Sequence, residues 1–209
     1  MTDFVSFARA IPRVVNVTLA GIVFAVAVPL SAQTLTAPAL VKALQVGGHV
    51  IVMRHASSPS EIPATPNQDN VPPERQLDEQ GRKTTAAMGE ALRRLKIPIG
   101  EVATSPTYRA RETVRRLGLP TSRSVPELGE GTGSMQAVSP AQTEWLRKRV
   151  TELPVGTNTV VVTHVPNISA AFPDAPAVAQ GEALVFGTDG KGGARVIGRI
   201  TIEQWPSFR

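Results

Sequence analysis

The stretch that decides the fold of this chain is Val50-Ile51-Val52-Met53-Arg54-His55. Four apolar residues, most of them β-branched, run directly into an arginine and a histidine. Such a short, continuous apolar run predicts a strand that is buried on both faces, as is typical of a parallel sheet under helices. Ligands bind such sheets at the carboxyl ends of the strands. Arg54 and His55 therefore stand where a binding site is expected.

A second stretch, Thr159-Val160-Val161-Val162-Thr163-His164, repeats this arrangement. The chain has only three histidines, and two of them follow apolar strands. If the two strands are parallel and close together, both imidazoles face the same crevice. Either histidine alone is most simply a structural residue at a strand end, but the pair, with Arg54 beside it, favours a functional site.

The remaining pattern alternates helices with strands. Helices are predicted at 37–45, at about 78–96, from Ser105, at 141–153 and from Pro166, and further strands at 101–104, just after 122, and at 183–188 and 194–202. The last two strands form a hairpin across the glycine-rich turn 189–193. This order predicts one α/β domain over residues 33–209, a three-layer α/β/α sandwich with a mostly parallel sheet.

Residues 1–32 have the features of a secretory signal. Arg9 and Arg13 precede an apolar segment, 17–30, which is followed by Ser31-Ala32-Gln33. We expect cleavage after Ala32. The alternative is an uncleaved anchor, although the strongly apolar part is short for a membrane span. In either case the domain is expected in the periplasm or outside the cell, and an uncleaved anchor would tether it to the membrane.

Composition excludes several kinds of site. The chain has no cysteine, so disulfides, thiolate metal sites and a cysteine nucleophile are ruled out. His49 and His55 lie six residues apart on one strand, which separates them by roughly 20 Å, so a zinc site fits poorly. The net charge of +5 comes from scattered lysines and arginines with few aromatics. No stacking platform for nucleic acid is visible, and an anionic small substrate explains this excess just as well.

Two segments without periodicity are predicted to be loops. The first, 56–76, leaves the carboxyl end of the strand before His55, so we expect it to wall the site. The second contains the glycine-rich run 129–133, which is not followed directly by a helix and has no Lys-Ser/Thr partner. This second loop is predicted to be a mobile flap rather than a nucleotide-binding loop.

A third candidate for the site is Arg109. Ser105-Pro106 predicts a helix start, because serine is a preferred N-cap and proline is preferred at the first helical position. Arg109 then lies in the first turn, near free backbone N–H groups, an arrangement that suits a bound phosphate. The alternative is a solvated charge, as is expected for the neighbouring arginines at 111, 115 and 116.

Two histidines, one or more arginines and a helix N-terminus describe a site for phosphoryl transfer. A neutral imidazole can attack phosphorus and carry the phosphoryl group. Arginines hold the phosphate oxygens and spread the developing charge. The second histidine can bind a phosphate oxygen or move a proton.

The segment Val52-Met53-Arg54-His55-Ala56 resembles the Arg-His-Gly signature of the histidine phosphatase superfamily, which has the phosphoglycerate-mutase-like fold. Alanine replaces the usual glycine. Three further segments are similar to family motifs in the same order: Glu74–Arg82 to the "Leu-Thr-x-x-Gly" helix start, Thr104–Thr113 to "Ser-Ser-Pro-x-x-Arg-Ala-x-x-Thr", and Val161–His164 to the second-histidine strand. The resemblance covers nearly all of residues 33–209, and the chain is most similar to the small bacterial phosphohistidine phosphatases.

The resemblance implies a role for each matched residue. His55 is the nucleophile that becomes phosphorylated, and His164 completes the pocket. Arg54 and Arg109 hold the phosphate together with Ser105. No metal and no cofactor are expected, and the partner is a phosphorylated small molecule or protein.

The general acid of the family is less directly matched. Mutases and broad-specificity members carry a glutamate in a "Leu-x-Glu" context after the third strand. Glu127, within Val125-Pro126-Glu127-Leu128, is the nearest candidate, and Glu130 is the next. Either glutamate can equally be an ordinary loop charge.

Three functions remain open from the sequence. The leading hypothesis is an exported, metal-independent phosphatase that hydrolyses phosphomonoesters through phosphorylated His55. A rival with the same fold is a phosphohistidine or phosphoprotein phosphatase, which needs no acid because imidazole leaves more easily than an alkoxide. The third is a non-catalytic phosphate-binding domain. A mutase is disfavoured because the chain is short.

Overall fold

A six-stranded sheet runs through the centre of this computed structural model, which describes residues 34–65, 74–119, 122–130 and 137–209. All of these residues fall within one unit of the chain, Ala32–Arg209. The strands are β1 (His49–Arg54), β2 (Ile99–Thr104), β3 (Arg123–Ser124), β4 (Asn158–Thr163), β5 (Ala183–Thr188) and β6 (Ala194–Ile200). The predicted signal at 1–32 lies outside the described residues, as do parts of both predicted loops.

The strand order is β3-β2-β4-β1-β5-β6. The first four strands in this order are parallel to one another, whereas β5 pairs antiparallel with β1 and with β6. The sheet is therefore parallel on one side, with the predicted hairpin as its antiparallel edge. Because β1 and β4 are direct neighbours with Arg54 opposite Thr163, the residues that follow each strand come together.

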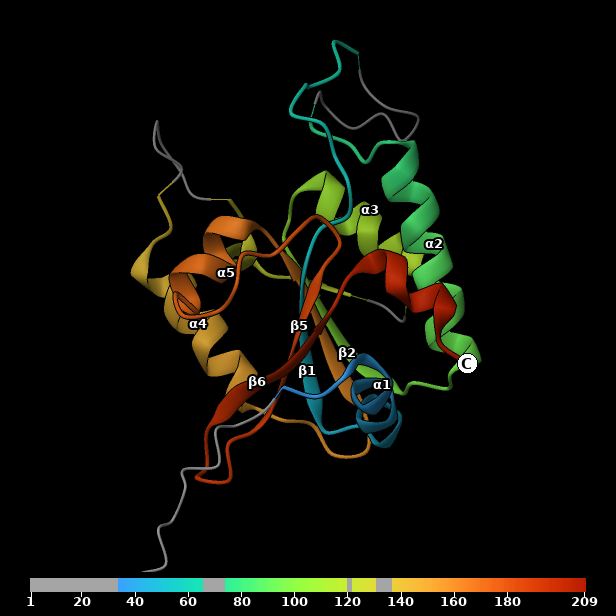
Figure 1. Ribbon diagram of the computed structural model, residues 1–209. Helices are drawn as coiled ribbons and strands as arrows, with labels where there is room; N and C mark the ends of the chain where they lie inside the picture. The colour runs from blue at the N-terminus through green and yellow to red at the C-terminus, as the bar shows by residue number, and fades with distance from the viewer. Residues whose placement is uncertain (1–33, 66–73, 120–121, 131–136) are drawn as a thin grey trace, which may run out of the picture. The chain divides into compact units, whose positions relative to one another are not determined.

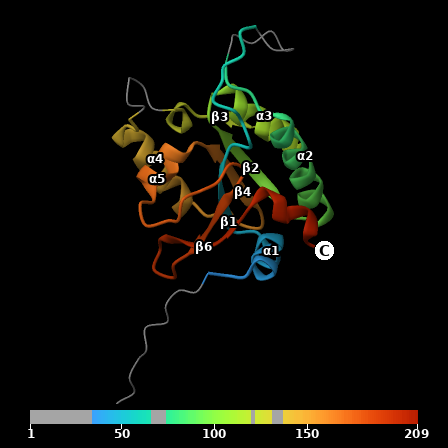
Figure 2. The same ribbon diagram turned by 45° about the horizontal axis from the view of Figure 1, so that its top comes forward.

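Helices cover both faces of the sheet, as Figures 1 and 2 show. The α-helices are α1 (Ala37–Val46), α2 (Glu79–Arg94), α3 (Tyr108–Leu117), α4 (Pro140–Thr151) and α5 (Val165–Ala171), and two 3-10 helices are η1 (Pro126–Leu128) and η2 (Ile202–Ser207). In both views α2 and α3 lie on one side of the sheet and α4 and α5 on the other. This arrangement confirms the predicted three-layer α/β sandwich.

The apolar run of β1 is buried on both faces because successive side chains of a strand point in opposite directions. Ile51 and Met53 pack in one core with side chains of α1, α2 and α3. Val50 and Val52 pack in a second core with side chains of α4 and α5. The absence of a polar face along β1 thus has a direct structural cause.

The helix predicted to begin at Ser105 starts two residues later. Thr107 is the N-cap of α3 and its side chain makes no capping bond. Instead, the backbone N–H of Tyr108 donates to Oε2 of Glu74 at 2.7 Å. The Ser105 hydroxyl oxygen accepts from the backbone N–H of Thr107 at 3.3 Å and also bonds His164, which follows the neighbouring strand, so it holds the turn that precedes the helix.

Two other expectations need adjustment. The strand predicted after 122 has only two residues, because Pro126 lacks the N–H that would continue the sheet and opens η1 instead. The last strand ends at Ile200 rather than 202, and η2 follows. The buried Trp205 of η2 packs against the core on the α2 side. Among the described residues, no helix is both long enough and apolar enough to span a membrane.

Candidate active site

The structure brings His55 and His164 together at the carboxyl ends of β1 and β4. Each histidine directly follows its strand, and both side chains are buried. Their ring centroids are 5.2 Å apart. The loop that leaves β1 begins at this edge of the sheet, at the top of Figure 1. The convergence predicted from the two strand sequences is therefore present.

The surroundings of His55 define which nitrogen is free. Nδ1 lies 2.8 Å from the carbonyl oxygen of Ala56, so Nδ1 carries the proton and donates it. Nε2 is left with a lone pair and accepts from Nε of Arg109 at 3.2 Å. Burial, together with the charges of the nearby His164 and Arg109, lowers the pKa of His55 to about 3, although the hydrogen bond to the Ala56 carbonyl opposes this shift. The imidazole is thus neutral over the physiological pH range, as a nucleophile must be.

His164 is held in the opposite sense. Its Nδ1 accepts from Nη2 of Arg109 at 3.3 Å, so Nε2 carries the proton and donates to Oγ of Ser105 at 2.8 Å. Burial, followed by the charges of Arg109 and Arg75, lowers the pKa of His164 to about 3. Ser105, predicted as a phosphate ligand, is therefore placed in the site as a partner of His164.

Arg109 lies between the two imidazoles in the first turn of α3. Its side chain is 2% exposed and donates to both rings. The hydroxyl of Thr113 donates to the carbonyl of Arg109 at 2.8 Å and accepts from the N–H of Ala56 at 3.1 Å. One side chain therefore links the backbone of the nucleophile to the helix that carries the arginine.

Arg54 lies close enough to this cluster for its charge to lower the pKa values of His55 and His164. Its Nη1 donates to the carbonyl of Val178 at 3.3 Å, while its buried Nε has no partner among the described residues. Burial, then repulsion from Arg75 and Arg109, lowers the pKa of Arg54. The pocket thus concentrates positive charge around two neutral imidazoles, and a phosphate dianion would offset that charge.

The structure distinguishes the two candidate acids. Glu130 forms an ion pair with Nη2 of Arg109, and its Oε1 lies 3.8 Å from Nδ1 of His164. Glu127 contributes only its backbone carbonyl to nearby contacts, accepting from Asn167, and its carboxylate makes no hydrogen bond or ion pair with a described residue. Glu127, the favoured candidate of the sequence reasoning, thus has no contact with Arg109 or with either histidine among the described side chains, whereas Glu130 contacts both Arg109 and His164. The signal was present, because Leu128-Gly129-Glu130 itself reads Leu-x-Glu.

Comparison with known proteins adds the family. Residues 50–131 match the family model of the histidine phosphatase superfamily, branch 1. The solved structure of the protein histidine phosphatase SixA complexed with tungstate is 18% identical with a TM-score of 0.55, covering 75% of this chain and 98% of that one. The putative phosphohistidine phosphatase SixA from Agrobacterium tumefaciens is 15% identical with a TM-score of 0.51, covering 74% and 99%. A putative alpha-ribazole-5'-P phosphatase from Escherichia coli is 16% identical with a TM-score of 0.52, covering 71% and 94%.

Residues 50–131 of the chain therefore carry the sequence features of the histidine phosphatase superfamily, whose chemistry is of the phosphatase or mutase type. The fold of the chain is phosphoglycerate-mutase-like. At these identities the solved structures establish the fold rather than a substrate. A search of curated proteins finds no match. Within the matched residues lie Arg54, His55 and Arg109, while His164 joins them from a later strand.

Sequence reasoning missed Arg75. Its Nε and Nη2 donate to the carbonyls of Pro59 and Ser58, at 2.7 and 3.0 Å. Burial, then repulsion from Arg109, lowers the pKa of Arg75, while the nearby Glu130 raises it. Arg75 thus adds a third guanidinium to the pocket. Only its place beside Leu77-Asp78 at the start of α2 could have pointed to it.

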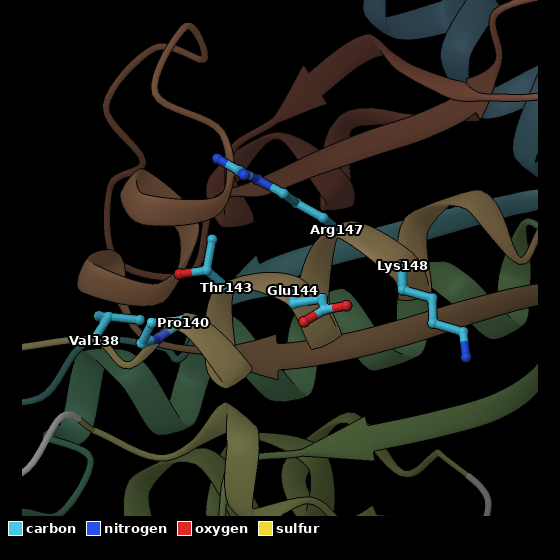
Figure 3. Close-up of a pocket in the computed structure, with 6 residues that line it drawn as sticks. All are labelled: Val138, Pro140, Thr143, Glu144, Arg147 and Lys148. Atoms are coloured by element: carbon cyan, nitrogen blue, oxygen red, sulfur yellow. The ribbon is translucent and has the colours of Figure 1, made fainter.

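Other parts of the described chain offer no comparable site. No three His, Cys, Asp or Glu side chains of these residues converge as metal ligands would. A shallow hollow along α4 is shown in Figure 3 and is lined by Val138, Pro140, Thr143, Glu144, Arg147 and Lys148. In that view Arg147 and Lys148 point away from each other, and Arg147 donates to the carbonyls of Ala170 and Ala171. These side chains therefore contribute to the surface of α4 and to its contacts with α5.

Proposed function

We propose that this chain is a metal-independent phosphatase that hydrolyses phosphomonoesters through a phosphohistidine on Nε2 of His55. The observation that carries the proposal is the tautomer of His55. With Nδ1–H bound to the Ala56 carbonyl, the lone pair of Nε2 lies beside Arg109, where phosphate oxygens would be held. A neutral, oriented imidazole next to guanidinium donors is what nucleophilic attack on phosphorus requires.

The proposed reaction has two steps. In the first, the lone pair of His55 Nε2 forms a bond to phosphorus, the ester P–O bond breaks, and the leaving alkoxide takes a proton from the carboxylic acid of Glu130. In the second, water attacks the phosphoryl group, Glu130 takes a proton from that water, and the P–N bond breaks to release inorganic phosphate. Arg54 and Arg109 hold the phosphate oxygens in both steps.

Glu130 supports ester hydrolysis rather than simple anion binding. In this structure its carboxylate is paired with Arg109 and faces His164. A phosphate monoester monoanion that binds to Arg109 takes over this ion pair and passes its proton to the released Glu130 carboxylate, which then enters the first step as a carboxylic acid. An acid in that position matters most for esters of poorly departing alcohols.

A phosphohistidine or phosphoprotein phosphatase is the second candidate. It is suggested by the fold that this chain shares with the SixA structures, one of which is matched over 98% of its length. Hydrolysis of a P–N bond needs less help from an acid, so such an enzyme would use Glu130 little. A non-catalytic phosphate-binding domain is the third candidate and would show saturable binding without turnover.

We also propose that the domain is exported. The proposal rests on the basic and apolar pattern of residues 1–32. Cell fractionation combined with amino-terminal sequencing of the mature protein tests it. A mature chain that starts at Gln33 supports cleavage, an intact amino terminus in the membrane supports an anchor, and an intact chain in the cytoplasm contradicts export.

The deciding experiment is a brief incubation with radiolabelled phosphodonors of graded leaving-group quality, followed by a quench. We expect protein-bound label that is acid-labile, base-stable and absent from His55→Ala, and unchanged by EDTA. Glu130→Gln should slow alkyl phosphates by about 10²-fold or more and p-nitrophenyl phosphate much less. Glu127→Gln is the matched control and should leave both rates near the wild-type values. Phosphate binding without label or turnover would contradict the proposal.

A further inference from the structure

We infer that Asn167 is a positioning residue that sets the place of Glu130 at the pocket. The inference rests on the proposed role of Glu130 as the general acid. Asn167 lies on α5, the helix that begins directly after His164, and its side chain is 1% exposed. It touches none of the proposed reacting atoms, so its effect must pass through the segment it holds.

The contacts of Asn167 are made with the two residues that lead to Glu130. Its Nδ2 donates to the carbonyl of Glu127 at 3.1 Å and to the carbonyl of Gly129 at 3.0 Å. Both donors of the amide are used on backbone that turns out of η1 just before the acid. These bonds therefore fix the backbone just before Glu130 relative to the helix that begins directly after His164.

The orientation of this amide follows from its partners. Two carbonyl oxygens can only be satisfied by the NH₂ group, and a flipped amide would place Oδ1 against both of them. In the observed orientation Oδ1 of Asn167 is buried without a partner among the described residues. An unpaired buried oxygen lowers the free energy of unfolding. The arrangement therefore holds the segment before Glu130 in place at some cost in stability.

Neighbouring side chains hold the same short segment, but each makes one bond to it. The hydroxyl of Thr163 donates to the carbonyl of Leu128 at 2.9 Å, and Nε2 of Gln142 donates to the carbonyl of Gly129 at 3.0 Å. Three successive carbonyls before Glu130 are therefore fixed by side chains. Asn167 alone among these three side chains bridges two of the carbonyls, so its loss frees the segment most.

The chain offers a matched control in Asn158. This residue is 0% exposed, its Nδ2 donates to the carbonyls of Leu44 and Pro98 at 2.7 and 2.9 Å, and its Oδ1 also lacks a partner among the described residues. It lies at the amino end of β4, the opposite end from the site. A substitution there removes the same chemistry without reaching Glu130.

The experiment compares Asn167→Leu, Asn158→Leu, Glu130→Gln and the double variant Asn167→Leu/Glu130→Gln in the full chain. For each, kcat/KM is measured with glycerol phosphate and with p-nitrophenyl phosphate. Asn167→Leu should lose about 10- to 10²-fold more activity toward the alkyl ester than toward the aryl ester. Asn158→Leu should lower stability similarly but affect both esters equally. The double variant should show no further selective loss beyond Glu130→Gln, because the two act through one acid.

The outcomes separate the two claims. If Glu130→Gln is selective for the alkyl ester and folded Asn167→Leu is not, the inference is wrong and the acid role stands. If Glu130→Gln is not selective either, the acid role fails and the inference fails with it. If Asn167→Leu does not fold, Asn167→Ser replaces it, because serine keeps one donor in a smaller side chain. An alkyl-to-aryl ratio of kcat/KM that lies between those of wild type and Glu130→Gln then supports the positioning role. A wild-type ratio in the serine variant overturns it.

Discussion

Each end of the β1–β4 strand pair has a histidine beside buried polar groups, but the partners of these groups differ between the two ends. At the amino end His49 lies opposite Asn158, whose amide joins two backbone turns. At the carboxyl end Arg54 lies opposite Thr163, and His55 follows next to a second histidine. The polar groups of the amino end bind the backbone of neighbouring segments, whereas the carboxyl end brings two imidazoles together.

The buried arginines of the two ends show the same contrast. Arg149 is 8% exposed, and its guanidinium meets Glu101 at 2.7 Å, Glu152 at 3.1 Å and the hydroxyl of Thr159 at 2.8 Å. Arg109 is buried as deeply, yet its donors go mainly to imidazoles, and Glu130 is its only carboxylate partner among the described residues. One arginine thus has two carboxylate partners at the amino end, whereas Glu130 is the one carboxylate paired with an arginine of the cluster Arg54, Arg75 and Arg109 among the described residues.

This difference shows that a shifted pKa is not sufficient to identify a site. Burial lowers the pKa of His49 as well as that of His55. What distinguishes His55 is that its Nε2 lone pair accepts from a guanidinium and that further arginines lie nearby. The excess of guanidinium groups over carboxylates, rather than burial, separates the active end from the structural one.

The largest expected difference between the two ends is in the histidines. His55→Ala should reduce turnover by about 10⁴-fold or more, because it removes the proposed nucleophile. His49→Ala should retain most activity and lose about 1 kcal/mol of stability through its half-buried ring. Steady-state kinetics and urea unfolding of both variants check this. Comparable losses of turnover would remove the distinction between the ends.

The arginines come next. Arg109→Lys should lower kcat by about 10²- to 10³-fold, because a lysine does not reproduce the fork that reaches both rings. Arg149→Lys should leave kcat near wild type and lower the free energy of unfolding by about 1–2 kcal/mol. Kinetics with p-nitrophenyl phosphate and chemical denaturation distinguish the two. If Arg149→Lys lost as much kcat as Arg109→Lys, compensated charge would not mark a structural role.

The pH dependence of stability sharpens the comparison further. The folded-state pKa values of His55 and His164, each about 3, lie below the unfolded value of 6.5. The unfolded chain therefore binds more protons between these values, so stability is full above pH 6.5 and falls as pH is lowered toward 3. Each histidine should contribute a slope of about 1.4 kcal/mol per pH unit within this window. The free energy of unfolding, measured with urea from pH 7.5 to 4.5, should fall less steeply with decreasing pH in His55→Asn/His164→Asn than in wild type. Equal slopes of this free energy against pH would contradict the assigned cause.

The smallest expected effect concerns two serines. Ser105→Ala removes the hydroxyl that accepts from His164, and should reduce kcat/KM by about 3- to 10-fold. Ser139→Ala removes the capping box of α4, and should lower stability by about 1 kcal/mol with no change in kcat/KM. Thermal unfolding and kinetics of the pair check this prediction, and an unchanged kcat/KM in Ser105→Ala would place that serine outside the site.

Much of the fold was predictable because local pattern and tertiary role coincide. The apolar runs before His55 and His164 could only be satisfied by strands covered on both faces, and the hairpin turn is fully encoded in 189–193. Parallel pairing then forces the two histidines to the same edge. The misplaced start of α3 is instructive, because the backbone N–H of Tyr108 found its acceptor in Glu74, 34 residues away.

The sequence by itself indicated the class of fold, the pair of histidines and Arg54, since these follow from strand periodicity, while Arg109 followed from the resemblance to the family motifs. Only the tertiary structure placed Glu130 against Arg109 and His164, added Arg75 and paired Ser105 with His164. The physical reason is that side-chain direction in a turn depends on which distant groups satisfy its carbonyls. For the turn before Glu130 those groups are on β4, α4 and α5, and no local pattern of 127–130 contains them.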